Sequence, residues 1–303
     1  MAAQPGYVLA GRFRLDQEIG RAEHGVVFRA TELESGRPIA VKVLYPSVAF
    51  QQGDAQRIAA DAAVLADSGA TSFVPVLACE VDEHGVVHVV MELCEGEPLD
   101  RHIADIEEFG DRAGPTKVID LLAPIAETLG RAHGQGLVHA DVKPSNVFLL
   151  DADSVIKENQ RGGGVRLTDF GIARTRAFDV TLDPRVILGS ASYVAPEVFW
   201  GARADARSDQ YAFASVIYRM LAGQTPFPAR STLELYDKVT SAPRPQLTAL
   251  RPELHPAIDA WASEALAIEP GRRYPTVQAM WRDFVASLLK NNAPNLARFR
   301  PPA

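Results

Sequence analysis

The chain is poor in the features that mark secreted, membrane-spanning and nucleic-acid-binding proteins. Its 303 residues include only two cysteines, Cys79 and Cys94, which excludes a disulfide framework and fits a reducing compartment. No run of about 20 apolar residues occurs, and residues 1–11 lack the charged and apolar blocks of a signal peptide. We therefore expect no membrane segment and a cytoplasmic location. A net charge of −7 provides no basic field that would attract nucleic acid.

What remains is the composition of an ordinary soluble globular protein, with 47% hydrophobic and 23% charged residues. The length suffices for one large hydrophobic core or two smaller ones. Arginine outnumbers lysine and alanine is abundant, a bias typical of GC-rich bacterial genomes that carries no information about chemistry.

The hydrophobic pattern changes at about residues 92–96. Before this point, short apolar runs alternate with turn residues and predict strands, and one helical pattern interrupts them over residues 54–67. After it, apolar residues recur mostly at helical spacing. We therefore expect an α+β fold with a small β-rich lobe over 7–94, a larger helical lobe over 95–290, and a tail over 291–303.

Two local features qualify this pattern. Pro124 lies within one helical pattern and predicts a kink there. The polar, glycine-rich stretch over 154–164 is predicted to be disordered. The predicted strands are 13–15, 25–30, 38–44, 74–81, 86–93, 137–138, 147–150 and 165–168, and the predicted helices are 54–67, 116–133, 209–221, 232–239, 256–267 and 276–289.

The most informative segment is the octapeptide His-Ala-Asp-Val-Lys-Pro-Ser-Asn at residues 139–146. It places a carboxylate (Asp141), an ammonium (Lys143) and an amide (Asn146) in one short loop. Phosphoryl transfer from ATP needs a carboxylate that orients the attacking hydroxyl, a cation near the migrating group and a neutral oxygen ligand for Mg²⁺. The three side chains could supply these functions in that order.

Four further motifs surround this loop in a fixed order. Upstream, a segment over 19–27 carries two glycines between predicted strands, where backbone N–H groups can approach phosphate oxygens closely. An apolar strand over 39–42 then ends in Lys42. Downstream come Asp-Phe-Gly at 169–171 and Ala-Pro-Glu at 195–197. Alone, the first segment would be interpreted as an ordinary hairpin, but together the motifs favour phosphate binding.

This ordered set resembles the signature of serine/threonine protein kinases, in particular the eukaryotic-like (Hanks-type) kinases of bacteria, over residues 7–289. The resemblance implies a bilobal protein-kinase-like fold. It also implies an enzyme that transfers the γ-phosphoryl group of ATP to Ser or Thr hydroxyls, with Mg²⁺ or Mn²⁺ as the metal. Protein substrates are the implied partners. By the same resemblance Asp141, Lys143 and Lys42 would be catalytic.

The resemblance also assigns residues that hold the nucleotide and the metal. Asn146 and Asp169 would bind the metal ion through oxygen atoms. Asp61 stands where the family has a glutamate that pairs with the strand lysine. Because aspartate is shorter by one methylene, that pair would need an inward shift of the helix or a bridging water. The implied nucleotide-binding residues are Gly20, Gly25, Val27, Ala40, Lys42, Asp61, Met91, Glu92, Cys94 and Phe148.

Two positions depart from the family pattern. Ala22 replaces the middle glycine of the phosphate loop. Ala140 stands where most members have an arginine that binds a phosphorylated residue of the activation segment, here residues 169–197. Because this anchor is missing, we predict activity that does not depend on phosphorylation of that segment. Its candidate phosphorylation sites are Thr175, Thr181, Ser190 and Ser192, although Ser190 is expected to contact Asp141 and Lys143 as a structural residue.

Three structural contacts are also expected from the resemblance. His139 should pack near Phe170, and Glu197 should form a buried ion pair with Arg273. Asp209 should anchor the backbone of residues 139–146, called the catalytic loop after the resemblance, from the start of a helix.

Three functions stay open on the sequence alone. The first is an active serine/threonine protein kinase, and the second is a pseudokinase that binds nucleotide or partner proteins with little or no phosphotransfer. The departures at Ala22, Asp61 and Ala140 support the second. The third, a small-molecule phosphotransferase of related fold, lacks the Ala-Pro-Glu motif and its arginine. The first is favoured because all of its key residues are intact, namely Lys42, Asp141, Lys143, Asn146 and Asp169.

Overall fold

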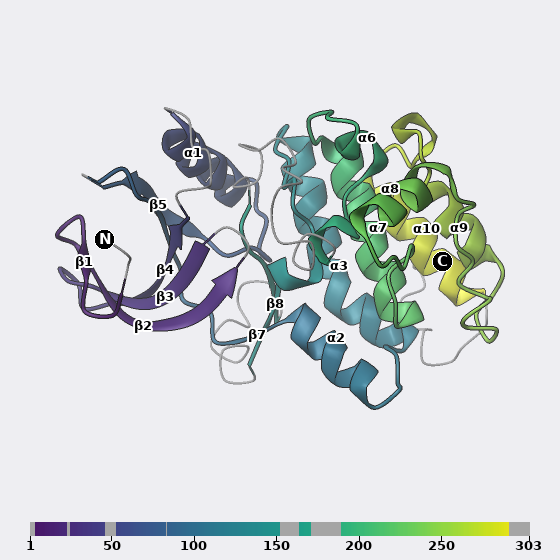
Figure 1. Ribbon diagram of the computed structural model, residues 1–303, viewed down its shortest axis with the longest axis horizontal. Coiled ribbons are helices and arrows are strands. Elements are labelled where there is room, and N and C mark those ends of the chain that lie inside the picture. The colour runs from purple at the N-terminus through teal and green to yellow at the C-terminus, as the bar shows by residue number, and fades with distance from the viewer. Residues whose placement is uncertain are drawn as a thin grey trace.

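The structure of the chain is a computed structural model, and Figure 1 shows a β-rich amino-terminal lobe beside a larger helical lobe. The expected α+β, bilobal fold is therefore confirmed. The predicted tail, most of the predicted disordered stretch, Thr175 and Thr181 lie outside the described residues. The described residues are 4–22, 25–45, 53–82, 84–151, 164–170 and 189–290.

A six-stranded antiparallel sheet forms the amino-terminal lobe, in the order β1-β2-β3-β4-β6-β5. Four of its strands follow the predicted apolar runs, whereas β1 was not predicted and β2 extends beyond the predicted 13–15. Alternate residues bury one face of the sheet against a hydrophobic cluster that includes Phe13, Phe28 and Val41. The strands are β1 (Val8–Leu9), β2 (Phe13–Ala22), β3 (Gly25–Glu32), β4 (Pro38–Leu44), β5 (Val76–Val81) and β6 (Val87–Met91).

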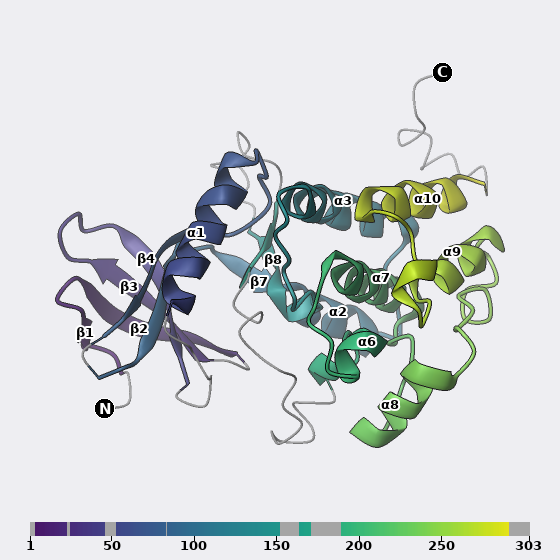
Figure 2. The same ribbon diagram turned by 90° about the horizontal axis from the view of Figure 1, so that it is seen from above.

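Helix α1 (Asp54–Asp67) packs against the other face of this sheet, as Figure 2 also shows. Its buried residues include Ile58, which packs in a cluster with Ala40 of β4 and Met91 of β6. Lys42 projects from the same face of β4 as Ala40, because side chains two residues apart on a strand point the same way. Ile58 and Lys42 therefore share the space between α1 and the sheet.

The lobes are joined by the chain itself and by backbone hydrogen bonds. Residues 92–95 lead from β6 into β7 (Gly96–Pro98), which pairs with β8 (Val147–Leu150), and β8 in turn pairs with β9 (Val165–Leu167). The segment that follows α1 is bonded to β9 of the other lobe. The amide of Val74 donates to the Leu167 carbonyl and the amide of Leu167 donates to the Ser72 carbonyl, both at 2.9 Å. The division of the chain at residues 94 and 95 stays a prediction.

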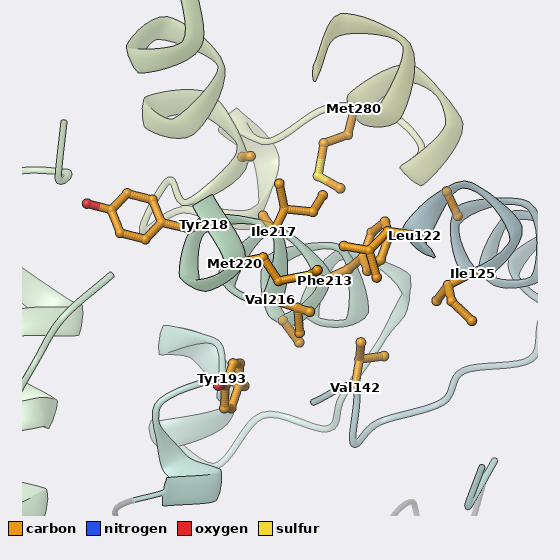
Figure 3. Packing of buried hydrophobic residues seen from close by; sticks show 14 of the residues in the cluster. Leu122, Ile125, Val142, Tyr193, Phe213, Val216, Ile217, Tyr218, Met220 and Met280 are labelled. Atoms are coloured by element: carbon orange, nitrogen blue, oxygen red, sulfur yellow. The ribbon is translucent and has the colours of Figure 1, made fainter. Parts of the chain in front are cut away.

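Helix α7 lies at the centre of the carboxyl-terminal lobe and is buried along most of its length. Figure 3 shows Phe213 and Ile217 of α7 packed with Leu122 and Met280 from the flanking helices, which lie side by side in Figure 2. The helices are α2 (Leu99–Glu108), α3 (Pro115–Gly134), α6 (Pro196–Phe199), α7 (Ala206–Ala222), α8 (Thr232–Ser241), α9 (Ala257–Ala265) and α10 (Val277–Leu289), with 3₁₀ turns at Pro144–Asn146 and Pro270–Arg272.

A capping box fixes the start of α7. The Asp205 carboxylate accepts from the amide of Ser208 at 2.9 Å, and the Ser208 hydroxyl accepts from the amide of Asp205 at 2.7 Å. This reciprocal pair places Asp209 in the first turn of the helix, facing the lobe interior.

The predicted helices are present, with bounds that differ by up to three residues. The helix predicted over 116–133 continues through Pro124, and the predicted kink there stays a prediction. The predicted strand over 137–138 is wrong. The Leu137 amide donates to the Ala132 carbonyl at 2.9 Å, so it closes the end of α3 instead of pairing with a strand.

Candidate functional site

The predicted phosphate loop is the hairpin that joins β2 to β3, in which Ala22 pairs with Gly25. A side chain at Gly25 would bring its Cβ within 2.2 Å of the Val43 carbonyl oxygen, so close packing of β3 on β4 requires glycine there. A Cβ at Gly20 would meet no atom within 4 Å. The tip of the hairpin, residues 23–24, lies outside the described residues.

Lys42 and Asp169 bring the two lobes into direct contact at the site. Lys42 is only 1% exposed, and its Nζ lies 2.5 Å from Oδ2 of Asp169, a residue that follows β9 in the other lobe. Asp169 has a φ of 62°, a left-handed conformation that aspartate tolerates better than most residues. The buried ammonium is thus neutralised by a carboxylate of the predicted metal site.

Asp61, the expected partner of Lys42, pairs instead with Arg57 one turn earlier on α1, at 3.2 Å. The α1 residue that shares the space beside Lys42 is Ile58, which carries no charge and so cannot pair with the ammonium. An approach of Asp61 to Lys42 in the nucleotide-bound protein stays a prediction.

The catalytic loop gathers the three polar groups that its sequence suggested. Oδ2 of Asp141 lies 2.9 Å from Nζ of Lys143 and accepts a hydrogen bond of 2.9 Å from Nδ2 of Asn146. Nζ of Lys143 also donates to the hydroxyl of Ser190 at 3.3 Å, one of the contacts expected for that serine. An oriented carboxylate and a cation therefore stand together beside the activation segment.

The two predicted metal ligands are held close to this loop. Nδ2 of Asn146 donates to both the carbonyl and the carboxylate of Asp141, which turns its amide oxygen away from that residue. The Thr168 amide donates to the Asn146 carbonyl at 2.8 Å, so Asp169 follows directly beside Asn146. An amide oxygen and a carboxylate are the hard ligands that Mg²⁺ prefers when phosphates and waters complete its shell, so these residues fit the ion.

Within the described residues, no group of three or more His, Cys, Asp or Glu side chains could hold a metal ion.

Asp209 holds the backbone of the catalytic loop, as expected. Its buried carboxylate accepts from the amides of His139 and Ala140 at 2.8 Å each, and Nε2 of His133 lies 2.9 Å away. Ala140 has a φ of 69°, which is unfavourable for a residue with a Cβ. The hydrogen bonds to Asp209 compensate for this strained conformation.

His139 has a structural position, also as expected. Its ring lies 5.0 Å from the ring of Phe170 in an edge-on arrangement. Nε2 lies 2.8 Å from the Thr168 carbonyl, and Nδ1 accepts from the Asp141 amide at 3.2 Å. Both ring nitrogens therefore hold backbone groups of the loop and of the segment that leads to Asp169.

Glu197 and Arg273 form the expected buried ion pair at the end of the activation segment, here called the Ala-Pro-Glu clamp. Two parallel hydrogen bonds of 2.8 and 2.7 Å join the guanidinium to the carboxylate, and the Arg273 side chain is 0% exposed. Its guanidinium also lies over the Tyr211 ring at 4.9 Å. This geometry fixes Ala-Pro-Glu to the helical lobe.

Four of the residues expected around the adenine ring lie near one another. Ala40 and Met91 belong to one hydrophobic cluster, against which Val27 and Cys94 pack. The Glu92 amide donates to the Pro75 carbonyl at 3.0 Å. Phe148 lies on β8, opposite Pro98.

One polar cluster was not found by sequence reasoning. Arg219 of α7 contacts Tyr193 and Glu107, residues that lie far from it in the chain. The available signal was an arginine inside the otherwise apolar pattern of residues 211–221.

Comparison with known proteins agrees with this geometry. The family model described as the protein kinase domain matches residues 13–295. The probable serine/threonine-protein kinase PknB of Corynebacterium glutamicum is 32% identical over 304 residues, which cover 96% of this chain and 44% of that protein. Serine/threonine-protein kinase PknL of Mycobacterium tuberculosis is 31% identical over 296 residues, which cover 98% of this chain and 70% of that protein.

The fold is also that of a solved relative. The crystal structure of the kinase domain of Mycobacterium tuberculosis PknI matches with a TM-score of 0.71 and 26% identity, covering 95% of this chain and 100% of that one. The chain spans less than half the length of the first curated relatives, such as the 44% of PknB. Within the described residues, none of the helices has the length and apolar character needed to cross a membrane.

Proposed function

The chain belongs to the serine/threonine protein kinase family, and from this premise we propose that it transfers the γ-phosphoryl group of ATP to Ser or Thr hydroxyls of proteins. The observation that carries the proposal is the convergence of charged groups from both lobes. Lys42 contacts Asp169 across the lobes, and Asp141 contacts Lys143 and Asn146 within the catalytic loop.

Each of these groups has a distinct task in the proposed reaction. Asp141 orients the acceptor hydroxyl and takes up its proton, while Lys143 balances negative charge on the migrating phosphoryl group. Lys42 exchanges its contact with Asp169 for the α- and β-phosphates. Asn146 and Asp169 would hold the divalent metal, which would supply positive charge that stabilises the phosphate groups. The protein therefore acts by positioning and electrostatics.

The nucleotide base would lie against the hydrophobic cluster of Ala40 and Met91. Val27 and Phe148 would contact the ring, and the backbone carbonyl of Glu92 and backbone groups of Cys94 would bind its polar edge. The apolar character of this cluster supports the proposal, since ligand sites combine apolar walls with a few polar groups. Gly20 and Gly25 would let the hairpin backbone approach the phosphates.

We further propose that activity does not require phosphorylation of the activation segment. In place of a phosphate-binding arginine, Ala140 offers only its backbone amide, which donates to Asp209. The loop is thus held by a carboxylate that is present at all times. Alanine substitutions at Thr175 and Thr181 should leave phosphorylation of an added substrate within about twofold of the unsubstituted chain. Loss of substrate phosphorylation in those variants would show that a switch exists.

One observation favours a second function, that of a nucleotide-binding pseudokinase. In the structure Lys42 pairs with Asp169 and Asp61 pairs with Arg57. The lysine therefore has no ion pair with the α1 carboxylate that the resemblance implied. If this arrangement persists with nucleotide bound, the phosphates would be held without being transferred efficiently.

A radiolabelled phosphate-transfer assay separates the two functions. The chain is incubated with ATP, Mg²⁺ or Mn²⁺, and a generic Ser- and Thr-containing protein, in parallel with the Asp141→Asn variant. We expect transfer by the unsubstituted chain, a loss of at least about 100-fold in the variant, and no transfer after chelation of the metal. If the unsubstituted chain transfers no more phosphate than the Asp141→Asn variant, the proposal of an active kinase is wrong. If the chain binds nucleotide without such transfer, the pseudokinase function is supported.

A further inference from the structure

Arg29 and Glu95 form an ion pair between the amino-terminal sheet and the segment that connects the lobes, residues 92–95. Arg29 lies on β3, and its Nη1 donates to Oε1 of Glu95 at 3.5 Å. The two residues are 66 positions apart in the chain, so only the fold brings them together. Neither side chain has a task in the proposed function.

The register of the sheet places Arg29 beside the proposed base site. Arg29 pairs with Ala40 of β4, and residues directly opposite each other on adjacent strands project from the same face. Ala40 belongs to the hydrophobic cluster that would contact the nucleotide base. Val27, two residues before Arg29 and on the same face, packs against this cluster. The Arg29 side chain therefore borders the wall that Ala40 and Val27 form.

Glu95 borders the same site from the connecting segment. It follows Cys94, which also packs against the hydrophobic cluster. The Glu95 carbonyl accepts from the Asp151 amide at 3.0 Å, and β7, which pairs with β8, begins at the next residue. The backbone of Glu95 is thus bonded to the carboxyl-terminal lobe, whereas Arg29 belongs to the amino-terminal sheet. The ion pair therefore links the two lobes.

This link lies at the end of the site that points away from the phosphates. Lys42, which would bind the phosphates, pairs with Val27 across β4 and β3. Arg29 pairs with Ala40, two residues farther along both strands. Arg29 and Glu95 therefore stand at the outer end of the base site. A base that enters or leaves by this end must pass between β3 and Glu95.

A second carboxylate, Asp16 of β2, attracts Arg29 from the side of the sheet. The pKa of the Asp16 carboxyl lies below its ordinary value. Burial raises this pKa, but hydrogen bonds from Thr31 and Arg14 outweigh burial, and the charge of Arg29 lowers it further. Asp16 is already bonded to the Thr31 hydroxyl at 2.6 Å and to Nε of Arg14 at 2.7 Å. Glu95 therefore remains the carboxylate to which Arg29 donates.

We propose that Arg29 and Glu95 form a strap across the outer end of the nucleotide site, and that the opening of this strap limits how fast nucleotide enters and leaves. The inference rests on the proposed nucleotide binding. The two side chains are 45% and 49% exposed, so the ion pair is weak and changes rates by a small factor. Because the strap does not contact the nucleotide, it slows entry and release equally and leaves the affinity unchanged.

The kinetic test uses three single variants, a double variant and a matched control. Arg29→Met and Glu95→Gln each remove one charge of the strap, and Arg29→Lys keeps the charge. The control is Arg12→Met, which removes a half-exposed ion pair with Glu80 elsewhere in the same lobe. Stopped-flow mixing with a fluorescent ATP analogue and Mg²⁺ gives the association rate constant, and a chase with unlabelled ATP gives the dissociation rate constant.

We expect both rate constants to rise by about threefold in Arg29→Met and in Glu95→Gln, and by less in Arg29→Lys. The double variant should match the single variants, because both changes remove one contact. High salt should bring the unsubstituted chain close to the variants, since it screens exposed ion pairs. Arg12→Met should change neither rate. Unchanged rates in the strap variants would overturn the proposal. So would faster release with a matching loss of affinity, which indicates a side chain that binds the nucleotide itself.

A second readout does not need nucleotide. Amide hydrogen exchange at residues 93–95 should be faster by about threefold in Arg29→Met than in the unsubstituted chain, with no change in Arg12→Met. If the chain binds no nucleotide, the proposed function fails while this measurement still decides whether the ion pair restrains the connecting segment. Unchanged exchange at residues 93–95 would show that it does not and would overturn the inference.

Discussion

The two lobes hold their functional charges in different ways. In the carboxyl-terminal lobe, Arg273 and Asp209 each have several hydrogen-bonding partners within the same lobe. In the amino-terminal lobe, Lys42 forms its ion pair with Asp169 of the other lobe, and Ile58 of α1 offers it no charge.

This difference separates a preorganised half of the site from an adjustable half. Within the described residues, the contacts of the catalytic loop and of the Ala-Pro-Glu clamp are formed without any ligand. In the proposed function, Lys42 would exchange the Asp169 carboxylate for nucleotide phosphates, and the exchange would cost little because a buried ammonium needs an anion in either state. Nucleotide binding should therefore change the lobe contact more than it changes the catalytic loop.

The largest expected effect comes from breaking the clamp of the preorganised half. Arg273→Met leaves the Glu197 carboxylate without its buried partner and removes the bonds to nearby carbonyls. We expect the free energy of unfolding to fall by about 3–5 kcal/mol, measured by urea denaturation. The exposed neighbour Arg272→Met should cost about 0–1 kcal/mol. A similar small loss in both variants would mean that the clamp contributes no stability.

Asp209 gives the next test of the same half. Asp209→Ala leaves the amides of His139 and Ala140 buried without acceptors, and each such group costs about 1–3 kcal/mol. We expect a loss of about 3 kcal/mol in unfolding free energy and a lower kcat with nearly unchanged nucleotide affinity. Equal losses of kcat and affinity would show that the loop and the nucleotide side are one unit.

The adjustable half is tested by substituting two of its carboxylates, Asp169 and Asp61, and measuring stability in the absence of nucleotide. Asp169→Asn leaves the Lys42 ammonium paired only with a neutral amide, and should lower the unfolding free energy by about 2 kcal/mol. Asp61→Asn weakens a partly exposed pair on one helix and should cost about 0.5 kcal/mol. Thermal and urea unfolding of both variants measures the difference. If Asp61→Asn lowers the unfolding free energy more than Asp169→Asn does, the ion pair on α1 stabilises the protein more than the ion pair between the lobes.

The smallest effect concerns the strained residue of the catalytic loop. Ala140 has a φ of 69°, so Ala140→Gly should relieve about 1 kcal/mol of backbone strain. The greater freedom of glycine in the unfolded chain offsets part of this gain. We expect a net stabilisation of about 0.5 kcal/mol, measured by denaturation. A loss of stability would mean that the Ala140 methyl group makes contacts that outweigh the strain.

Local patterns predicted most of the elements and failed where long-range contacts decide. The helix over 54–67 follows from its apolar spacing, and its bounds agree with α1. Residues 137–138 look like a strand by composition, but the end of α3 takes up the Leu137 amide. Strand β7 has only three residues, too few for a periodic signal, and was not predicted. Helix α2 was also not predicted, although Leu99, Ile103 and Ile106 recur there at helical spacing.

By itself, the sequence determined which chemical groups the site contains and in what order. Asp141, Lys143 and Asn146 lie within one short loop, so any fold that forms the loop brings them together. Tertiary structure alone decided which charges meet, because Lys42 and Asp169, or Arg219 and Glu107, are more than 100 residues apart. Burial selects such pairs: a charge removed from water takes the nearest complementary group, and that group is fixed by the packing of whole elements.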